Sequence, residues 1–158
     1  MPIIQLVARC PAFLSLMLLS LVMFGVTTAE AQVTRDKIIE HLEFLGYTSE
    51  KVDQGIKATH PTKFGFVLVE LLDGLIIQSV FAGVPLDQND AARLTAVNTL
   101  TTSAAVARFF WASSGELAMR AWFPGGYEKA RFTPFIEAWE QDSLTIRTTY
   151  ETLKPYLK

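Results

Sequence analysis

The sequence predicts one α+β domain with an antiparallel sheet of about five strands flanked by three helices. Two stretches are typical of β-hairpins, because apolar runs flank Asp73-Gly74 and, later, Ser113-Ser114-Gly115. Three other stretches have apolar residues at helical spacing. The order is helix, strands, helix, hairpin, helix, and this order favours a single α+β domain rather than a parallel α/β sheet.

Residues 1–31 are typical of a secretory signal peptide. An apolar core over residues 12–26 follows Arg9, and Ala29-Glu30-Ala31 forms an A-x-A site that predicts cleavage before Gln32. The competing interpretation is an uncleaved membrane anchor. We favour cleavage, because the apolar core is shorter than the ~20 residues that a membrane-spanning helix needs.

Cleavage would leave a mature domain of residues 32–158 that lacks cysteine. The only cysteine of the chain is Cys10, which lies in the predicted signal peptide. A secreted domain without disulfides depends on its hydrophobic core for stability. We therefore expect a periplasmic or secreted protein with no membrane span after cleavage.

Residues 34–45 are expected to form the first helix. Thr34 is the expected N-cap, and Val33 and Ile38 match a hydrophobic staple. Gly46 matches the position just after a helix, where a left-handed backbone favours glycine. The apolar stripe of this helix consists of Ile38, Leu42 and Leu45.

Two short strands, over residues 51–53 and 56–59, are expected next, at an edge of the sheet. The first hairpin follows over residues 64–81. With Asp73-Gly74 as its loop, Val69 lies opposite Gln78 and Phe66 opposite Phe81. One face of this hairpin is almost entirely hydrocarbon and consists of Val67, Val69, Leu71, Ile76, Val80 and Ala82. The other face mixes apolar residues with Glu70 and Ser79, and we expect one face of the sheet to be fully covered.

The second helix is expected to end near Leu100. Either Asp87 or Asn89 caps it, after a loop that begins at Ala82. Its expected inward stripe is Ala91, Leu94, Val97 and Leu100.

Residues 104–123 form the second predicted hairpin, for which two registers are open. A two-residue loop at Ser114-Gly115 places Phe110 opposite Met119, whereas a three-residue loop places Arg108 opposite Arg120. We favour the first register, because directly opposed like charges are unfavourable. The last helix is then expected to begin with Thr133 as N-cap and Pro134 at its first position. Residues 127–132 form either a preceding helical turn or a loop. The apolar stripe of the last helix consists of Ile136, Trp139, Ile146, Tyr150, Leu153 and Leu157.

The sequence contains no constellation of catalytic or metal-binding residues. The mature chain has two histidines and no cysteine, which gives no plausible zinc spacing. Ser114-Gly115 lacks the surroundings of a nucleophile elbow, and no phosphate-binding loop is present. A net charge of −2 without a basic cluster argues against nucleic-acid binding. We expect no enzyme, no metal and no cofactor.

One group of residues indicates a binding surface. In the favoured register Phe109, Trp111, Arg120 and Trp122 share one face, and large aromatics with arginine are typical of interaction hot spots. The alternative is that these aromatic residues pack beneath a helix while Arg120 extends to water.

Four features of the sequence are distinctive together: Leu45-Gly46-Tyr47, Asn98, residues 108–111 (RFFW) and residues 117–124 (LAMRAWFP). In these features the chain resembles the YbjN family of bacterial proteins, which are named as sensory transduction regulators. It implies a fold similar to that of class I type III secretion chaperones. It also implies protein–protein binding, with a homodimer as a common arrangement.

The sequence therefore predicts an exported, non-enzymatic protein-binding or regulatory domain of YbjN type, with chaperone-like binding as one form of that role. Its partner-binding residues would be Phe109, Trp111, Arg120 and Trp122, and its partner would be a protein or a second copy. The alternative prediction is a periplasmic carrier of a small apolar ligand held between sheet and helices.

Overall fold

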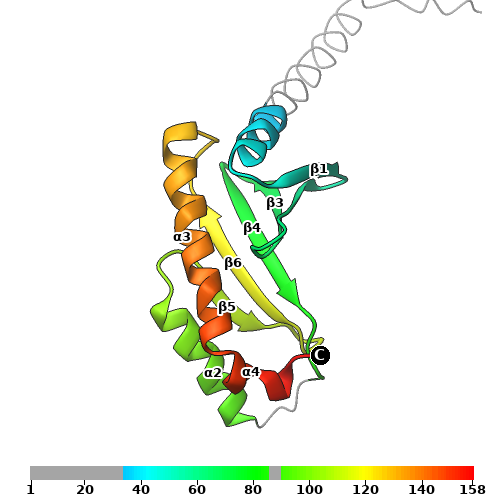
Figure 1. The fold of residues 1–158 in the computed structure, drawn as a ribbon, viewed down its shortest axis with the longest axis vertical. Coiled ribbons are helices and arrows are strands. Elements are labelled where there is room, and N and C mark those ends of the chain that lie inside the picture. The colour runs from blue at the N-terminus through cyan, green and yellow to red at the C-terminus, as the bar shows by residue number, and fades with distance from the viewer. Residues whose placement is uncertain (1–33, 86–89) are drawn as a thin grey trace, which may run out of the picture. The chain divides into compact units, whose positions relative to one another are not determined.

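The computed structural model describes residues 34–85 and 90–158 and confirms the α+β class (Figure 1). Its six strands form one antiparallel sheet in the order β1-β2-β3-β4-β6-β5. Residues 37–158 form one compact unit. The predicted signal peptide and the cleavage site at Ala29, Ala31 and Gln32 lie outside the described residues and stay predictions.

The strands are β1 Thr48–Val52, β2 Gly55–Thr59, β3 Phe66–Leu71, β4 Gly74–Phe81, β5 Arg108–Trp111 and β6 Leu117–Phe123. The helices after β4 are α2 Ala91–Ser103, α3 Lys129–Thr148, α4 Tyr150–Leu153 and the short 3-10 helix η1 Lys154–Tyr156.

The first helix, described over residues 34–44, ends as predicted. Gly46 has a φ of 88°, and the backbone N–H of Tyr47 donates to the carbonyl of Leu42. This pairing satisfies a carbonyl at the helix end through a left-handed glycine. Ile38 and Leu42 are buried. The predicted N-cap at Thr34 is wrong, because Thr34 is itself helical.

The first hairpin forms, but its loop is shifted. Leu71 pairs with Gly74 and Val69 with Ile76, so the loop is Leu72-Asp73 rather than Asp73-Gly74. Gly74 is a strand residue that packs closely on β6, where a Cβ atom would lie 2.6 Å from the Trp122 ring. The glycine is therefore required by close packing rather than by the turn.

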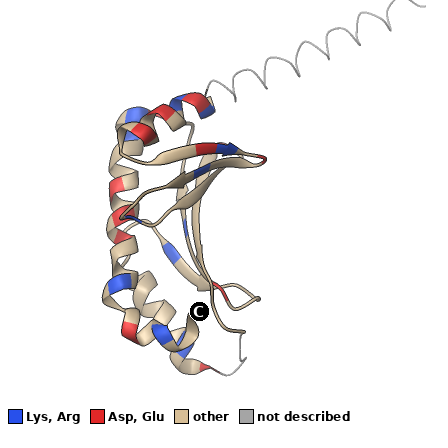
Figure 2. Ribbon diagram, turned by 45° about the vertical axis from the view of Figure 1, so that its right-hand side comes forward, with Lys and Arg blue, Asp and Glu red and all other residues tan. Residues whose placement is uncertain are grey.

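In Figure 2 the long helix α3 runs along one side of the sheet. The burial of the side chains shows that the mixed face of this hairpin is covered and that the hydrocarbon face is open. Phe66, Leu68, Leu75 and Ile77 are buried. Val67, Leu71 and Val80, which belong to the opposite face, remain exposed. The prediction that one face is covered holds, but the more apolar face is the uncovered one.

The second helix, α2, is capped by Asp90, whose carboxylate accepts the backbone N–H of Arg93 at 2.8 Å. The two predicted caps, Asp87 and Asn89, lie outside the described residues. Val97 and Leu100 are buried as predicted. Ala91 and Leu94 are exposed, and Arg93 and Ala96 occupy the buried positions instead.

The second hairpin adopts the register that we rejected. Arg108 pairs with Arg120 and Phe109 with Met119 around a three-residue loop, in which Gly115 has a φ of 94°. A shift of one residue moves every side chain to the other face of the sheet. Leu117, Met119 and Phe123 of β6 share one face as predicted, and this face is the buried one, but the faces of the β5 residues are exchanged.

The last long helix, α3, begins at Lys129 and contains Pro134 in its interior. The predicted N-cap at Thr133 is therefore wrong, and residues 127–132 end in a helical turn. Phe132 is fully buried beneath this turn, and its packing outweighs the local signal for a later start. Pro134 is exposed, so the carbonyl that loses its partner can bond to water.

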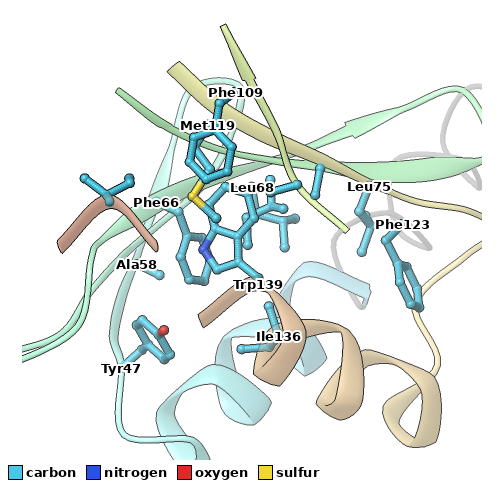
Figure 3. Close-up of a cluster of buried hydrophobic side chains, with 14 of the residues drawn as sticks. Tyr47, Ala58, Phe66, Leu68, Leu75, Phe109, Met119, Phe123, Ile136 and Trp139 are labelled. Carbon is cyan, nitrogen blue, oxygen red and sulfur yellow. The ribbon is translucent and has the colours of Figure 1, made fainter. Parts of the chain in front are cut away.

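Trp139 lies at the centre of the core between α3 and the sheet (Figure 3). It is 1% exposed, and its ring centroid lies 6.2 Å from that of Phe66. Leu68 and Met119 complete its surroundings from the sheet. Ile136, Ile146 and Leu153 are buried as predicted, whereas Tyr150 is 45% exposed, because α3 ends at Thr148 and the chain turns into α4.

The buried carboxylate of Asp142 ties α3 to the start of β5. Its two oxygens accept the backbone N–H groups of Ala105, Val106 and Ala107, each at 2.8 Å. Three successive N–H groups that converge on one carboxylate form charge-assisted hydrogen bonds. This contact fixes the position of the strand that follows, with Arg108 and Phe110.

Candidate functional site: the outer face of the sheet

The uncovered face of the sheet, which we call the outer face, is the strongest candidate site. Its exposed apolar members include Val80, at 50% exposure, and Trp122, at 41%. Exposed apolar patches with a polar rim mark interaction surfaces more often than isolated exposed residues do. The outer face consists of Lys57, Val67, Val69, Leu71, Ile76, Gln78, Val80, Arg108, Phe110, Arg120 and Trp122.

The structure separates the four predicted partner-binding residues. Arg120 and Trp122 lie on the outer face and are exposed, whereas Phe109 is 4% exposed and packs in the core beneath the helices. Trp111 is half-buried on the same side as Phe109. The observed register also brings Phe110 and Arg108 to the outer face, and sequence reasoning missed both. The three-residue loop that we considered and rejected would have found them.

One row of side chains crosses all six strands of the outer face. It runs Glu50, Lys57, Val67, Gln78, Arg120, Arg108, each directly opposite the next. Glu50 and Lys57 form an ion pair of 2.8 Å at one end. Arg108 and Arg120, at the other end, make no ion pair with any residue that the structure describes. The row therefore has a positive end.

Arg120 is held in place by two neighbours on the outer face. Its Nε donates to Oε1 of Gln78 at 2.8 Å, and its guanidinium carbon lies 5.2 Å from the centroid of the Phe110 ring. Stacking on an aromatic ring and a hydrogen bond at Nε orient the planar guanidinium group. The two terminal nitrogens keep their capacity to bind a carboxylate in a bidentate manner.

The loop of the first hairpin exposes a further apolar side chain, that of Leu72. Leu72 is 92% exposed and has a φ of 52°, the only positive φ of a non-glycine residue in the described part of the chain. A left-handed backbone costs an L-residue about 1–2 kcal/mol. An exposed leucine in this conformation contributes little to folding, and such strain is characteristic of functional sites.

Two shallow hollows lie on the outer face and share Ile76. The larger, of about 410 Å³, is lined by Val67, Val69 and Val80 among others. The smaller, of about 270 Å³, is lined by Phe110, Arg120 and Trp122 among others. Their apolar floor with arginine at one side suits an apolar side chain adjacent to a carboxylate.

Trp111 has a structural partner in the buried Arg93. The guanidinium carbon of Arg93 lies 4.0 Å from the Trp111 ring centroid, and the indole N–H donates to the carbonyl of Arg93. Arg93 also donates to the carbonyls of Val84, Pro85 and Gly115. This cluster joins α2 to two loops, so Trp111 belongs to the packing beneath the helices.

The shifted titratable groups lie away from the outer face. Burial, followed by the nearby Lys129, lowers the pKa of His41, whose two ring nitrogens contact the hydroxyls of Tyr127 and Thr133. Burial and the Glu140 carboxylate raise the pKa of Tyr47, which donates to Glu140 at 2.9 Å. These groups join helices to the sheet or to each other and form no nucleophile–base pair.

Metal ions and membranes are two further classes of partner to consider for residues 34–85 and 90–158. No group of three or more His, Cys, Asp or Glu side chains in this part of the chain is arranged to hold a metal ion. Among the helices of the same residues, none has the length and apolar character needed to span a membrane. The space between sheet and helices, where the alternative prediction places a small ligand, is occupied by Trp139, Phe66 and Met119 (Figure 3).

Comparison with known proteins identifies the fold. No protein-family model and no curated protein matches the chain. A solved structure, that of YbjN from E. coli, matches 78% of this chain and 94% of its own chain, with a TM-score of 0.59 and 14% sequence identity. The chain has the YbjN-type fold. The E. coli YbjN is described as a proposed transcription regulator. At this identity the similarity establishes the architecture, and the YbjN-type fold alone assigns no partner.

Proposed function

We propose that this chain is an exported, non-enzymatic protein-binding domain of regulatory type, and that the outer face of its YbjN-type sheet is the contact surface. The observation that supports this proposal is the uncovered apolar face that includes Trp122 and Arg120 on β6, the strand beside the edge strand β5. Tryptophan and arginine are the residue types most enriched at binding hot spots. The regulatory role proposed for the E. coli structure is consistent with a binding function.

Protein is the class of partner that suits this face best. A nucleic-acid surface needs several phosphate contacts, and the outer face offers two arginines without an ion pair beside a broad apolar floor. An apolar centre with a charged margin is instead the composition of protein interfaces. Regulation would then proceed through protein contact rather than through DNA.

Export is the second part of the proposal and rests on the sequence of residues 1–31. We expect the processed protein, isolated from its host, to have an intact mass that starts at Gln32. A mass that still includes Met1 would instead show that the chain keeps its N-terminal segment and is anchored. The mass is measured on the protein as its host produces it.

The binding proposal is tested by substitutions on the outer face. Trp122→Ala and Arg120→Glu should each leave unfolding cooperative and abolish partner capture, because both side chains are exposed. Leu94→Ala, at a 56% exposed apolar position on α2, is the matched control and should leave capture intact. If Trp122→Ala or Arg120→Glu unfolds the protein, these residues are structural, and the proposal fails.

A further inference from the structure

We infer that the outer face receives an acidic, apolar segment of another protein, whose carboxylates bind Arg108 and Arg120. This inference rests on the proposed function and names the chemistry of the partner. Its first observation is that Arg108 and Arg120 lie directly opposite each other on neighbouring strands, without a carboxylate partner among the described residues. Like charges in this arrangement destabilise a sheet, and a bound carboxylate relieves the repulsion.

The geometry of Arg120 favours a carboxylate over other partners. Gln78 and Phe110 fix the guanidinium plane, and neither terminal nitrogen donates to any described residue. A pre-oriented guanidinium loses little side-chain entropy when it forms a bidentate pair. The apolar part of the segment has a matching surface close by, since Ile76, which lines both hollows, lies directly opposite Trp122.

The same charges argue against a second copy of this chain as the occupant. A two-fold arrangement that joins two outer faces adds another Arg108 and another Arg120 to the interface. Glu50, the carboxylate of the same row, is already paired with Lys57 at 2.8 Å. A segment with free aspartate or glutamate side chains compensates the positive end without breaking an existing pair.

The test is a selection from a random peptide library displayed on phage, with the chain purified as its host produces it. We expect the selected peptides to combine Asp or Glu with apolar residues, and their binding to weaken as salt is raised. Arg120→Ala should raise the dissociation constant of the selected peptides roughly tenfold, which corresponds to about 1.4 kcal/mol. The charge-reversed variant Arg108→Glu/Arg120→Glu should select basic apolar peptides instead.

Four outcomes would overturn the inference. Selected peptides without acidic residues, or an unchanged preference after charge reversal, would show that the arginines do not choose the partner. Concentration-dependent dimerisation that Trp122→Ala abolishes would show that a second copy occupies the outer face; protein binding would then stand and only the acidic partner would be wrong. If Trp122→Ala leaves peptide binding unchanged and the peptides bind elsewhere on the protein, the proposed function is overturned as well.

Discussion

Replacing Asp142 with alanine should cost about 4 kcal/mol of unfolding free energy and disturb the outer face from the opposite side of the sheet. A hydrogen bond to a charged group is worth about 1.5–3 kcal/mol. Asp142 accepts three of them, but the backbone near Ala105 is exposed and water can replace that bond. The N–H of Ala107 is buried and would stay unpaired, which makes the loss of the other bonds costly.

The measurement is urea unfolding followed by tryptophan fluorescence, with Glu137→Gln on the exposed side of the same helix as the control. Asp142→Asn should fall between the two variants, at about 2 kcal/mol, because one amide oxygen still accepts but the NH₂ group meets another donor. If Asp142→Ala unfolds within about 1 kcal/mol of the parent protein, the carboxylate does not hold the start of β5, and our account of how this strand is positioned is wrong.

Three further predictions concern positions with unusual backbone, burial or protonation. Leu72→Gly should stabilise the fold by about 1 kcal/mol, because it relieves a left-handed leucine, and should weaken partner binding; an unchanged or lower midpoint of urea unfolding would contradict the strain. Gly74→Ala should destabilise by about 2–3 kcal/mol, because its Cβ would overlap the Trp122 ring, and a neutral result in the same assay would contradict the close packing. Acid should weaken the fold through His41, because the pKa of this side chain is lower in the folded state than the unfolded value of 6.5. Between these two pKa values the unfolded chain binds a proton that the folded chain does not. The free energy of unfolding therefore decreases as pH falls below 6.5 toward the folded pKa. His41→Gln should flatten this part of the pH profile, and an unchanged slope would refute the assignment.

Local signals predicted the elements whose ends depend on neighbours in sequence. Gly46 ends the first helix because the requirement for a left-handed backbone is a property of that one residue. The strands β1 and β2 formed where short runs flank a turn. The α+β class followed from the order of such elements.

The registers of both hairpins were wrong because distant contacts decide them. Gly74 resembles a turn residue in sequence, but it is placed by Trp122, which is far along the chain. The opposed arginines looked unfavourable in isolation, yet Gln78 of another strand binds Arg120. Sequence therefore placed Arg120 and Trp122 together on one face, as in the structure, but added Phe109, which lies in the core.

Contacts between distant parts of the chain also decide which face of the first hairpin is covered. Hydrophobicity alone favours burial of the valine-rich face of the first hairpin. The helices instead cover the other face, whose Leu68 and Ile77 belong to the same buried cluster as Trp139. No local rule predicts that the valine-rich face stays exposed to solvent. This exposure is the basis of the proposed function.

The most direct test of the outer face as a protein-binding surface is photocrosslinking in the living host. A photoreactive amino acid is placed at Trp122 and, as the control, separately at Leu94 on α2, which is 56% exposed against 41% for Trp122. Our account predicts a specific protein adduct at position 122 and none at position 94. The crosslinked segment of the partner should be rich in acidic residues, and the adduct should be lost when Arg120→Glu is added. Equal crosslinking at both positions, or none at 122, would contradict the account.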